Sequence, residues 1–202
     1  MDSPICLKAA LREQIFARRR TAHAADRAAM GGMSRDAMEH FLATGLHNGV
    51  EIISGYCPIR TEIDPTPLME TLHAAGHRLC VPVVQGRGVA LKFREWHPDA
   101  EMIEGPFGAL VPATGAWLKP RLLITPLLGF DADGWRLGYG GGFYDRTLER
   151  LRAVRPTLAI GFAYSAQQVE AVAREATDQP LDAIVTELGL MRATAAVSTG
   201  QG

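Results

Sequence analysis

One stretch of this chain has too many glycines to form an ordinary helix or strand. Between Asp131 and Arg146, glycine stands at positions 134, 138, 140, 141 and 142. Each glycine loses more backbone entropy on folding than other residues do, and it contributes no side chain to packing. The preceding residues 122–128 are typical of a buried strand, and residues 144–154 carry apolar side chains at helical spacing. The glycines therefore lie between a strand end and a helix start.

A glycine-rich bend in that position is suited to bind an anion. Bare backbone N–H groups and the positive end of the helix dipole both favour negative charge. Arg136 and Arg146 add positive charge, and Asp145 is able to hold a divalent cation against a phosphate. We interpret the stretch as a nucleotide-phosphate site. The alternative is a tight turn closed by an Arg–Asp pair. Neither a dinucleotide fingerprint nor a Walker A loop is present to decide between the two.

Size and charge narrow the possible classes of protein. The chain has 202 residues, 47% of them hydrophobic, and a net charge of −1. These values favour a single domain over residues 1–202, with a frayed tail over 191–202. A nearly neutral chain argues against a nucleic-acid partner, and no apolar run approaches the roughly 20 residues of a membrane span.

The cysteines and the N-terminus bear on location. Cys6, Cys57 and Cys80 are few and widely spaced, which fits a reducing compartment. No secretory apolar stretch opens the chain. We expect a cytoplasmic protein, a monomer or weak homo-oligomer, that binds neither nucleic acid nor membrane.

Strand and helix patterns alternate along the chain. Expected strands cover residues 50–56, 78–84, 89–96, 122–128, 157–162 and 183–186, and expected helices follow residue 3 and cover 22–48, 66–75, 144–154 and 166–174. Residues 97–120 are rich in Pro and Gly and are expected to form an irregular covering loop. The alternation predicts an α/β fold: a mostly parallel sheet with helices on both faces, in an open three-layer architecture.

Two basic residues of the first helix share one side. Leu7, Leu11 and Ile15 form an apolar stripe, and Lys8 and Arg12, four residues apart, project together beside it. From periodicity alone a solvated basic face is the simpler interpretation. Residues 18–20, all arginine, are expected to be solvated.

Five motifs follow one another in a recognisable order. They are Lys8-x-x-Leu11-Arg12, Glu62-Ile63-Asp64, Phe93-Arg94-x-Trp96-x-Pro98, the run Gly134-x-Arg136-Leu137-Gly138-Tyr139-Gly140-Gly141-Gly142-Phe143-Tyr144-Asp145-Arg146, and Asp178 ahead of the last strand. Together they cover nearly the whole chain, and they resemble the 5-formyltetrahydrofolate cyclo-ligase family, also called 5,10-methenyltetrahydrofolate synthetases. The resemblance implies an ATP-dependent ligase of folate one-carbon metabolism. Its members phosphorylate the formyl oxygen of 5-formyltetrahydrofolate, close the ring through N10, and release ADP and phosphate.

The resemblance also implies roles for individual residues. Catalytic roles fall to Lys8, Arg136 and Asp145, and Mg²⁺ is held by Asp145 and Asp178. ATP is bound by Lys8, Arg12, Arg136, Leu137, Gly138, Tyr139, Gly140, Gly141, Gly142, Phe143 and Tyr144. The folate is bound by Cys57, Glu62, Trp96, Tyr139, Phe143 and Tyr144, with the Glu62 carboxylate accepting hydrogen bonds from pterin N–H groups.

The chain departs from the family pattern at four positions. Phe143 stands where members often have Tyr, and Val111 replaces an acidic residue of the covering loop. At Tyr139 and Gly141 some members carry basic residues, so phosphate charge must rest on fewer cations here.

Two other functions remain open on the sequence. One is a non-catalytic relative that binds and sequesters formylfolate. The other is a different α/β enzyme, such as a sugar-phosphate isomerase or CoA-transferase relative, because a fold hosts many functions.

Overall fold

The computed structural model describes residues 4–194, with the side chains of the first helix described from residue 11 onward. The helices are α1 (Pro4–Ala28), α2 (Gly32–Ala43), α3 (Thr66–Ala74) and α4 (Phe143–Arg152), with short 3-10 turns η1 (Pro106–Gly108) and η2 (Ser165–Gln167). The strands are β1 (Ile52–Ser54), β2 (Arg78–Val83), β3 (Lys92–Trp96), β4 (Met102–Glu104), β5 (Leu110–Pro112), β6 (Trp117–Leu118), β7 (Leu122–Thr125), β8 (Gly129–Phe130), β9 (Arg136–Leu137), β10 (Leu158–Phe162), β11 (Ala183–Thr186) and β12 (Gly189–Arg192). No helix of these residues is long and apolar enough to cross a membrane.

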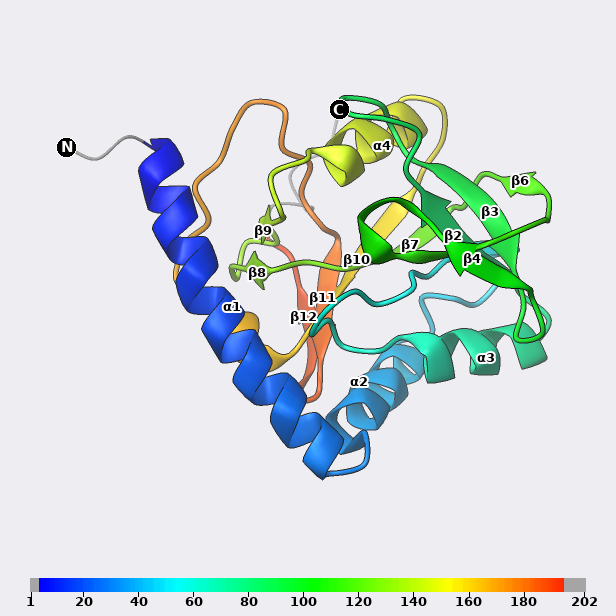
Figure 1. The fold of residues 1–202 in the computed structure, drawn as a ribbon, viewed down its shortest axis with the longest axis horizontal. Coiled ribbons are helices and arrows are strands. Elements are labelled where there is room, and N and C mark those ends of the chain that lie inside the picture. The colour runs from blue at the N-terminus through cyan, green and yellow to red at the C-terminus, as the bar shows by residue number, and fades with distance from the viewer. Residues whose placement is uncertain (1–3, 195–202) are drawn as a thin grey trace.

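A mixed sheet runs through the centre of the molecule (Figure 1). Its strand order is β12-β11-β10-β7-β1-β2-β3-β6. The inner strands β11, β10, β7, β1 and β2 pair in parallel, while β12 at one edge and β3 and β6 at the other pair antiparallel. The strand order reverses between β1 and β7. In doubly wound sheets, ligands bind in the crevice outside the carboxyl ends of the strands at such a reversal.

Alternate residues of the strands bury opposite faces of the sheet. In β7, Leu122 and Ile124 pack against α2 and α3, whose Phe41 and Leu72 belong to the same buried cluster. Leu123 points the other way and packs with Leu148 of α4. The two clusters confirm the predicted α/β class, with helices on both faces in three layers.

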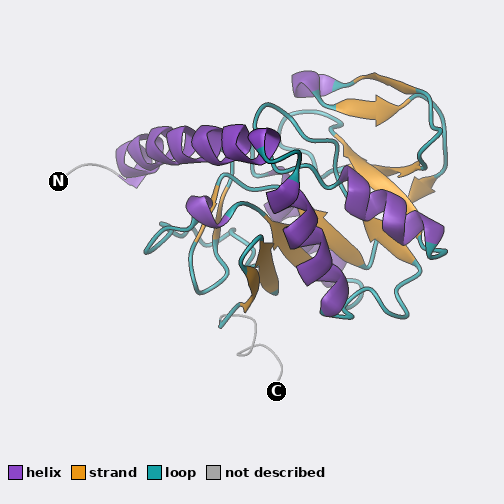
Figure 2. Ribbon diagram, turned by 90° about the horizontal axis from the view of Figure 1, so that it is seen from below, coloured by secondary structure: helices purple, strands orange, loops and turns teal. Residues whose placement is uncertain are grey.

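Helix α1 lies outside these layers, across the carboxyl end of the sheet, and Figure 2 shows its N-terminal end extending beyond the rest of the protein. Ile15 anchors it in a third cluster with Leu128, Leu137 and Val172. The helix approaches so closely that a Cβ at Gly129 would stand 2.6 Å from Cδ1 of Ile15. The apolar stripe predicted for the first helix thus fixes α1 over the segment that follows β7.

The structure corrects several predicted elements. Residues 97–120 are not irregular throughout, because they form the hairpin of β4 and β5 and the edge strand β6. The helix expected over residues 166–174 is only the 3-10 turn η2. The chain continues past the expected last strand into β12, so residues 191–192 are strand rather than tail, and residues 195–202 lie outside the described part. The prediction of a single domain stays a prediction.

The packing of α4 on the sheet gives a stability test. Leu148 is fully buried, and its truncation to Ala leaves a cavity under α4. We expect Leu148→Ala to lower the free energy of unfolding by about 2–5 kcal/mol, measured by urea denaturation. Arg150→Ala, on the exposed side of the same helix, is the control and should cost far less. Equal losses in the two variants would contradict the assigned packing of α4.

Candidate active site

Three segments meet at the carboxyl end of the sheet, next to the reversal of strand order. Residues 55–65 follow β1, residues 126–142 follow β7, and α1 lies across both. The sequence motifs quoted above supply residues to all three segments. Residues of three of the motifs therefore meet where the topology predicts a binding crevice.

The glycine-rich bend links β9 to α4. Gly140 and Gly142 have φ of +93° and +60°, a region that side chains disfavour, and Gly142 is the N-cap residue of α4. At Gly141 a Cβ would stand 2.6 Å from the ring of Phe143. Gly140 and Gly141 are exposed, and in the described part of the chain no acceptor binds their backbone N–H groups. The bend thus presents bare backbone donors at a helix N-terminus, as an anion site requires.

Arg12 of α1 reaches this bend. Its Nε donates a hydrogen bond to the carbonyl of Gly138 at 3.1 Å, and its Nη2 would be 3.5 Å from a Cβ at Gly140. Arg12 is therefore not on a purely solvated face. Lys8 stands one helical turn earlier, but its side chain lies outside the described residues.

Arg136 and Asp145 form a partly buried ion pair beside the bend. Nη2 of Arg136 lies 2.7 Å from Oδ1 of Asp145, and its Nη1 donates to the carbonyl of Gln179. The backbone N–H of Gln179 donates to the same Oδ1 at 3.0 Å. Burial lowers the pKa of Arg136, and the charge of Asp145 opposes that shift, with a smaller contribution from Asp178. The pair ties the start of α4 to the segment before β11.

Two carboxylates near Arg136 fit the predicted magnesium site in part. Both hydrogen bonds to Asp145 use Oδ1, and Oδ2 of Asp178 accepts from the backbone of Glu175 at 2.8 Å. Among the described residues, no group of three or more His, Cys, Asp or Glu side chains is placed to hold a metal ion. Mg²⁺ is commonly bound through one or two carboxylates together with substrate phosphates and water. Asp145 and Asp178 suit that mode and would not form a complete protein cage.

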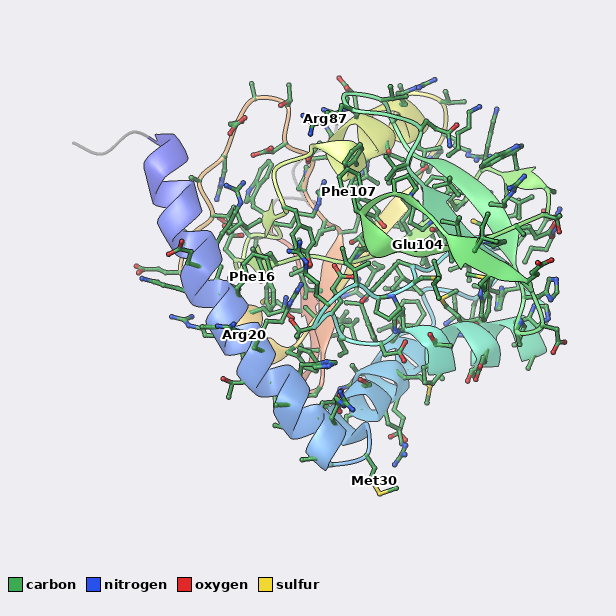
Figure 3. All side chains as sticks on the ribbon, viewed as in Figure 1. Phe16, Arg20, Met30, Arg87, Glu104 and Phe107 are labelled. Atoms are coloured by element: carbon green, nitrogen blue, oxygen red, sulfur yellow. The ribbon has the colours of Figure 1, made fainter. Side chains whose placement is uncertain are left out.

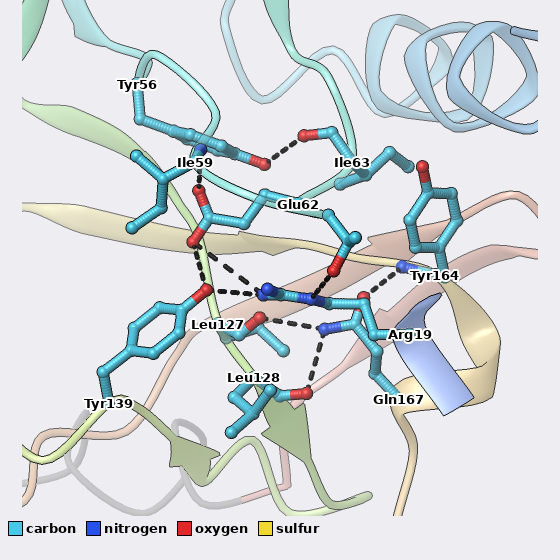
Figure 4. Close-up of polar contacts among 11 residues, drawn as sticks. Arg19, Tyr56, Ile59, Glu62, Ile63, Leu127, Leu128, Tyr139, Tyr164 and Gln167 are labelled. Carbon is cyan, nitrogen blue, oxygen red and sulfur yellow. Dashed lines mark hydrogen bonds and ion pairs between the residues drawn. The ribbon is translucent and has the colours of Figure 1, made fainter. Parts of the chain in front are cut away.

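Glu62 lies in the loop after β1 (Figure 4). Its side chain is almost fully buried, and its Oε2 accepts a hydrogen bond from the backbone N–H of Ile59 at 2.9 Å. Its Oε1 accepts one from the hydroxyl of Tyr139, in the glycine-rich stretch, at 2.8 Å. Burial raises the pKa of Glu62, whereas these two hydrogen bonds and the charges of Arg19 and Arg60 oppose the rise.

Arg19 completes the same cluster, which the sequence interpretation missed. Its side chain is 0% exposed. Its Nε donates to Oγ1 of Thr61 at 3.0 Å, its Nη1 donates to the hydroxyl of Tyr139 at 2.6 Å, and Nη1 stands 3.9 Å from Oε1 of Glu62. The expectation of solvated arginines fits the exposed Arg18 and Arg20 but is wrong for Arg19. The helical spacing could have indicated this burial, because Arg19 follows the buried Ile15 by four residues and so lies on the same face of α1.

The aromatic candidates at the start of α4 are close to the bend. Phe143 has its ring centroid 5.9 Å from that of Phe107, at the tip of the hairpin of β4 and β5, and Figure 3 shows Phe107 beside the start of α4. The hydroxyl of Tyr144 is buried and makes no hydrogen bond to a described residue. Burial raises the pKa of Tyr144, with the charge of Glu62 adding to the effect.

Two predicted site residues have side chains in the core. Leu137 is 2% exposed and packs with Ile15, so its side chain does not face the bend. Trp96 is buried on the α2 and α3 side of the sheet and pairs with Leu79, near the amino end of β2. This position corrects the expectation that Trp96 contacts a ligand at the carboxyl end, and we leave Trp96 out of the site.

Comparison with known proteins identifies the family. The model of the 5-formyltetrahydrofolate cyclo-ligase family matches residues 5–187. The chain belongs to this family. A cyclo-ligase of Escherichia coli K12 is 38% identical over 131 residues, which cover 62% of this chain and 71% of the relative. One of Haemophilus influenzae is 35% identical over 135 residues, covering 64% and 72% respectively.

Solved structures of cyclo-ligases agree with this assignment. The 5,10-methenyltetrahydrofolate synthetase of Aquifex aeolicus superposes with a TM-score of 0.76 at 28% identity, covering 97% of this chain and 95% of that one. The synthetase of Mycoplasma pneumoniae gives a TM-score of 0.69 at 25% identity, covering 89% and 98%. The predicted family resemblance is confirmed, and the chain is an enzyme of the ligase class rather than a sugar-phosphate isomerase or CoA-transferase relative.

Cys57 offers a probe of the loop after β1. Burial, with a contribution from the charge of Asp64, raises the pKa of Cys57 to about 11. Only the thiolate is alkylated, so the rate with iodoacetamide should keep rising steeply up to about pH 10 in a variant whose other cysteines are serine. An unperturbed thiol, with a pKa near 8.5, would approach a plateau by then. A plateau near pH 9 would contradict the partly buried position of Cys57.

Proposed function

We propose that this enzyme converts 5-formyltetrahydrofolate and ATP into 5,10-methenyltetrahydrofolate, ADP and phosphate. The formyl oxygen attacks the γ-phosphorus of ATP, and ADP leaves. N10 of the folate then attacks the activated formyl carbon, the C–O bond breaks, and phosphate departs with the former formyl oxygen. Loss of the N10 proton leaves the methenyl bridge. The alternative of a non-catalytic relative that sequesters formylfolate has no observation in its favour.

One observation carries the proposal: the hydroxyl of Tyr139, in the glycine-rich stretch, contacts Glu62 directly. The anion-binding bend and the carboxylate suited to pterin N–H groups are thus neighbours. A phosphoryl acceptor bound at Glu62 would lie beside a triphosphate bound at the bend. In phosphoryl transfer the protein acts chiefly by such positioning and by neutralising charge.

The phosphates would be held by backbone and by cations. We assign this role to the N–H groups of the bend, to Arg12 and Arg136, and by family resemblance to Lys8. Since the bend itself carries Tyr139 and Gly141 where some members have basic residues, α1 supplies much of the positive charge. The donors face charge that develops on the transferred phosphoryl group.

Mg²⁺ would be held by Asp145 and Asp178, with the remaining positions left to phosphate oxygens and water. When bound, the ion neutralises phosphate charge. Arg136 is paired with Asp145 at 2.7 Å and is within electrostatic reach of Asp178, so its positive charge acts on both carboxylates.

The folate would be held on the opposite side of the crevice. Oε1 of Glu62 has lone-pair capacity beyond the Tyr139 hydroxyl and is suited to accept from pterin N–H groups. Cys57, Phe143 and Tyr144 are assigned to line the same space. Phe143 keeps the aromatic surface but lacks a hydroxyl group.

We further propose that the enzyme acts in the cytoplasm as a monomer or weak homo-oligomer, in a single domain. Cys57 and Cys80 are both free thiols, which agrees with a reducing compartment.

The activity is tested directly by mixing purified protein, Mg-ATP and 5-formyltetrahydrofolate and following the absorbance of the methenyl product together with ADP release. We expect product only with ATP present, and loss of turnover when EDTA removes the metal. Asp145→Asn should reduce kcat by at least about 100-fold, because one of the two carboxylates that would hold Mg²⁺ loses its charge. Binding of formylfolate without product would instead support the sequestering alternative.

Substitution of Arg12 tests whether ATP binding can be weakened without weakening folate binding. Arg12→Leu should raise the KM for ATP by about 10-fold or more, the size of one hydrogen bond to a charged group, and leave the KM for folate nearly unchanged. Arg20→Leu removes the same charge from an exposed position of the same helix and serves as control. Equal effects on both KM values would remove Arg12 from the phosphate site.

A further inference from the structure

Arg19 is a fully buried cation to which no role has been assigned. A guanidinium stays protonated in proteins, so burying it requires a compensating anion nearby. Among the described residues, Arg19 forms an ion pair with Glu62, at 3.9 Å, and the hydroxyl of Tyr139 lies between them. The three side chains form a chain of two hydrogen bonds, which we call the relay: Arg19 donates to Tyr139, and Tyr139 donates to Glu62.

The two carboxylate oxygens of Glu62 have different hydrogen-bond partners. Oε2 is fixed by the backbone of Ile59, whereas Oε1 faces Tyr139 and the guanidinium. Because Nη1 of Arg19 acts on Oε1 across the hydroxyl, it favours the carboxylate form and also fixes its direction. Nη2 of Arg19 is buried and donates to no described acceptor. The guanidinium therefore keeps one N–H donor group that this cluster does not use.

We propose that Arg19 is a positioning residue for the folate, holding Glu62 as a correctly directed, negatively charged acceptor for the N–H groups of the pterin. This inference rests on the proposed function and deepens it. Arg19 acts through Glu62 and Tyr139 and is not assigned a contact with the reacting atoms.

The charge state of Glu62 is set by groups from every segment around it. Arg19 comes from α1, Arg60 from the same loop as Glu62, and Tyr139 from the glycine-rich stretch. Burial raises the pKa of Glu62, and Arg19, Arg60 and Tyr139 oppose that rise. Tyr56 and Tyr144 also interact electrostatically with Glu62. Burial raises the pKa of both tyrosines, so they stay neutral.

The sign of the expected pH effect follows. Glu62 must be ionised to accept from the pterin, so the KM for folate should rise as pH falls through the pKa of Glu62. Removing Arg19 removes a charge that lowers this pKa, so the rise in KM should begin at higher pH. The titration of the substrate itself is the same for every variant and cancels in the comparison.

The experiment compares KM for folate, KM for ATP and kcat over about pH 5.5 to 9 for wild type, Arg19→Gln and Arg19→Lys. Arg19→Gln keeps polar atoms near Tyr139 and Thr61 but loses the charge. We expect its folate KM to be raised about ten-fold near pH 6 and less above pH 8, with kcat and the KM for ATP within about two-fold. Arg19→Lys should restore most of the wild-type profile. Arg20→Gln is the matched control, because its side chain is exposed.

A double-mutant cycle separates positioning from a merely structural role. In a Glu62→Gln background, which cannot ionise, Arg19→Gln should add no further pH-dependent loss of folate binding. An additive loss, or a pH profile of Arg19→Gln that overlays the wild type, would overturn the proposal.

A second variant keeps the test decisive if Arg19→Gln does not fold. Tyr139→Phe changes a partly exposed residue and removes the hydroxyl that donates to Glu62, so its folate KM profile should shift to higher pH in the same direction. An unshifted profile would overturn the relay. Absence of methenyl product in the wild type would instead count against the proposed function itself.

Discussion

Burial of two opposite charges at the carboxyl end of the sheet is the constraint on which the site depends. Neither Arg19 nor Glu62 can be taken out of water alone without a cost of several kcal/mol. Together, with Tyr139 between them, they tie α1, the loop after β1 and the glycine-rich stretch into one cluster. The apolar contact of Ile15 brings α1 to this place, and the polar cluster fixes how it is seated.

Much of the fold was predictable because its inner strands obey simple rules. Alternating strands and helices predicted a parallel sheet, and buried runs such as residues 122–125 carry the continuous apolar pattern that such sheets require. The antiparallel edges were harder to foresee. β4, β5 and β6 are two or three residues long and lie between prolines and glycines, and β12 follows β11 after a short turn. Segments that short carry no periodicity, so only tertiary pairing defines them.

The local part of the site was predictable and the long-range part was not. The bend at residues 138–142 follows from its glycines, and the neighbouring Asp145 from its place at the helix start. Arg19 was missed because a buried arginine is unusual and because its partner Tyr139 stands 120 residues away. Trp96 shows the opposite error: its motif resembles the family, yet its side chain fills the core.

The position of Tyr139 joins the two halves of the proposed reaction. It belongs to the stretch whose backbone is assigned to the phosphates, but its hydroxyl binds the carboxylate assigned to the pterin. A folate that hydrogen-bonds to Glu62 must share the carboxylate with the Tyr139 hydroxyl or displace that hydroxyl. The backbone of Tyr139 continues directly into the bend. Because coupling between two binding sites is reciprocal, a triphosphate that orders the bend would also affect Glu62. Where some family members place a basic residue in the bend, this chain has a tyrosine paired with a cation from α1, so in the proposed reaction the same position would connect charge at the phosphates to recognition of the folate.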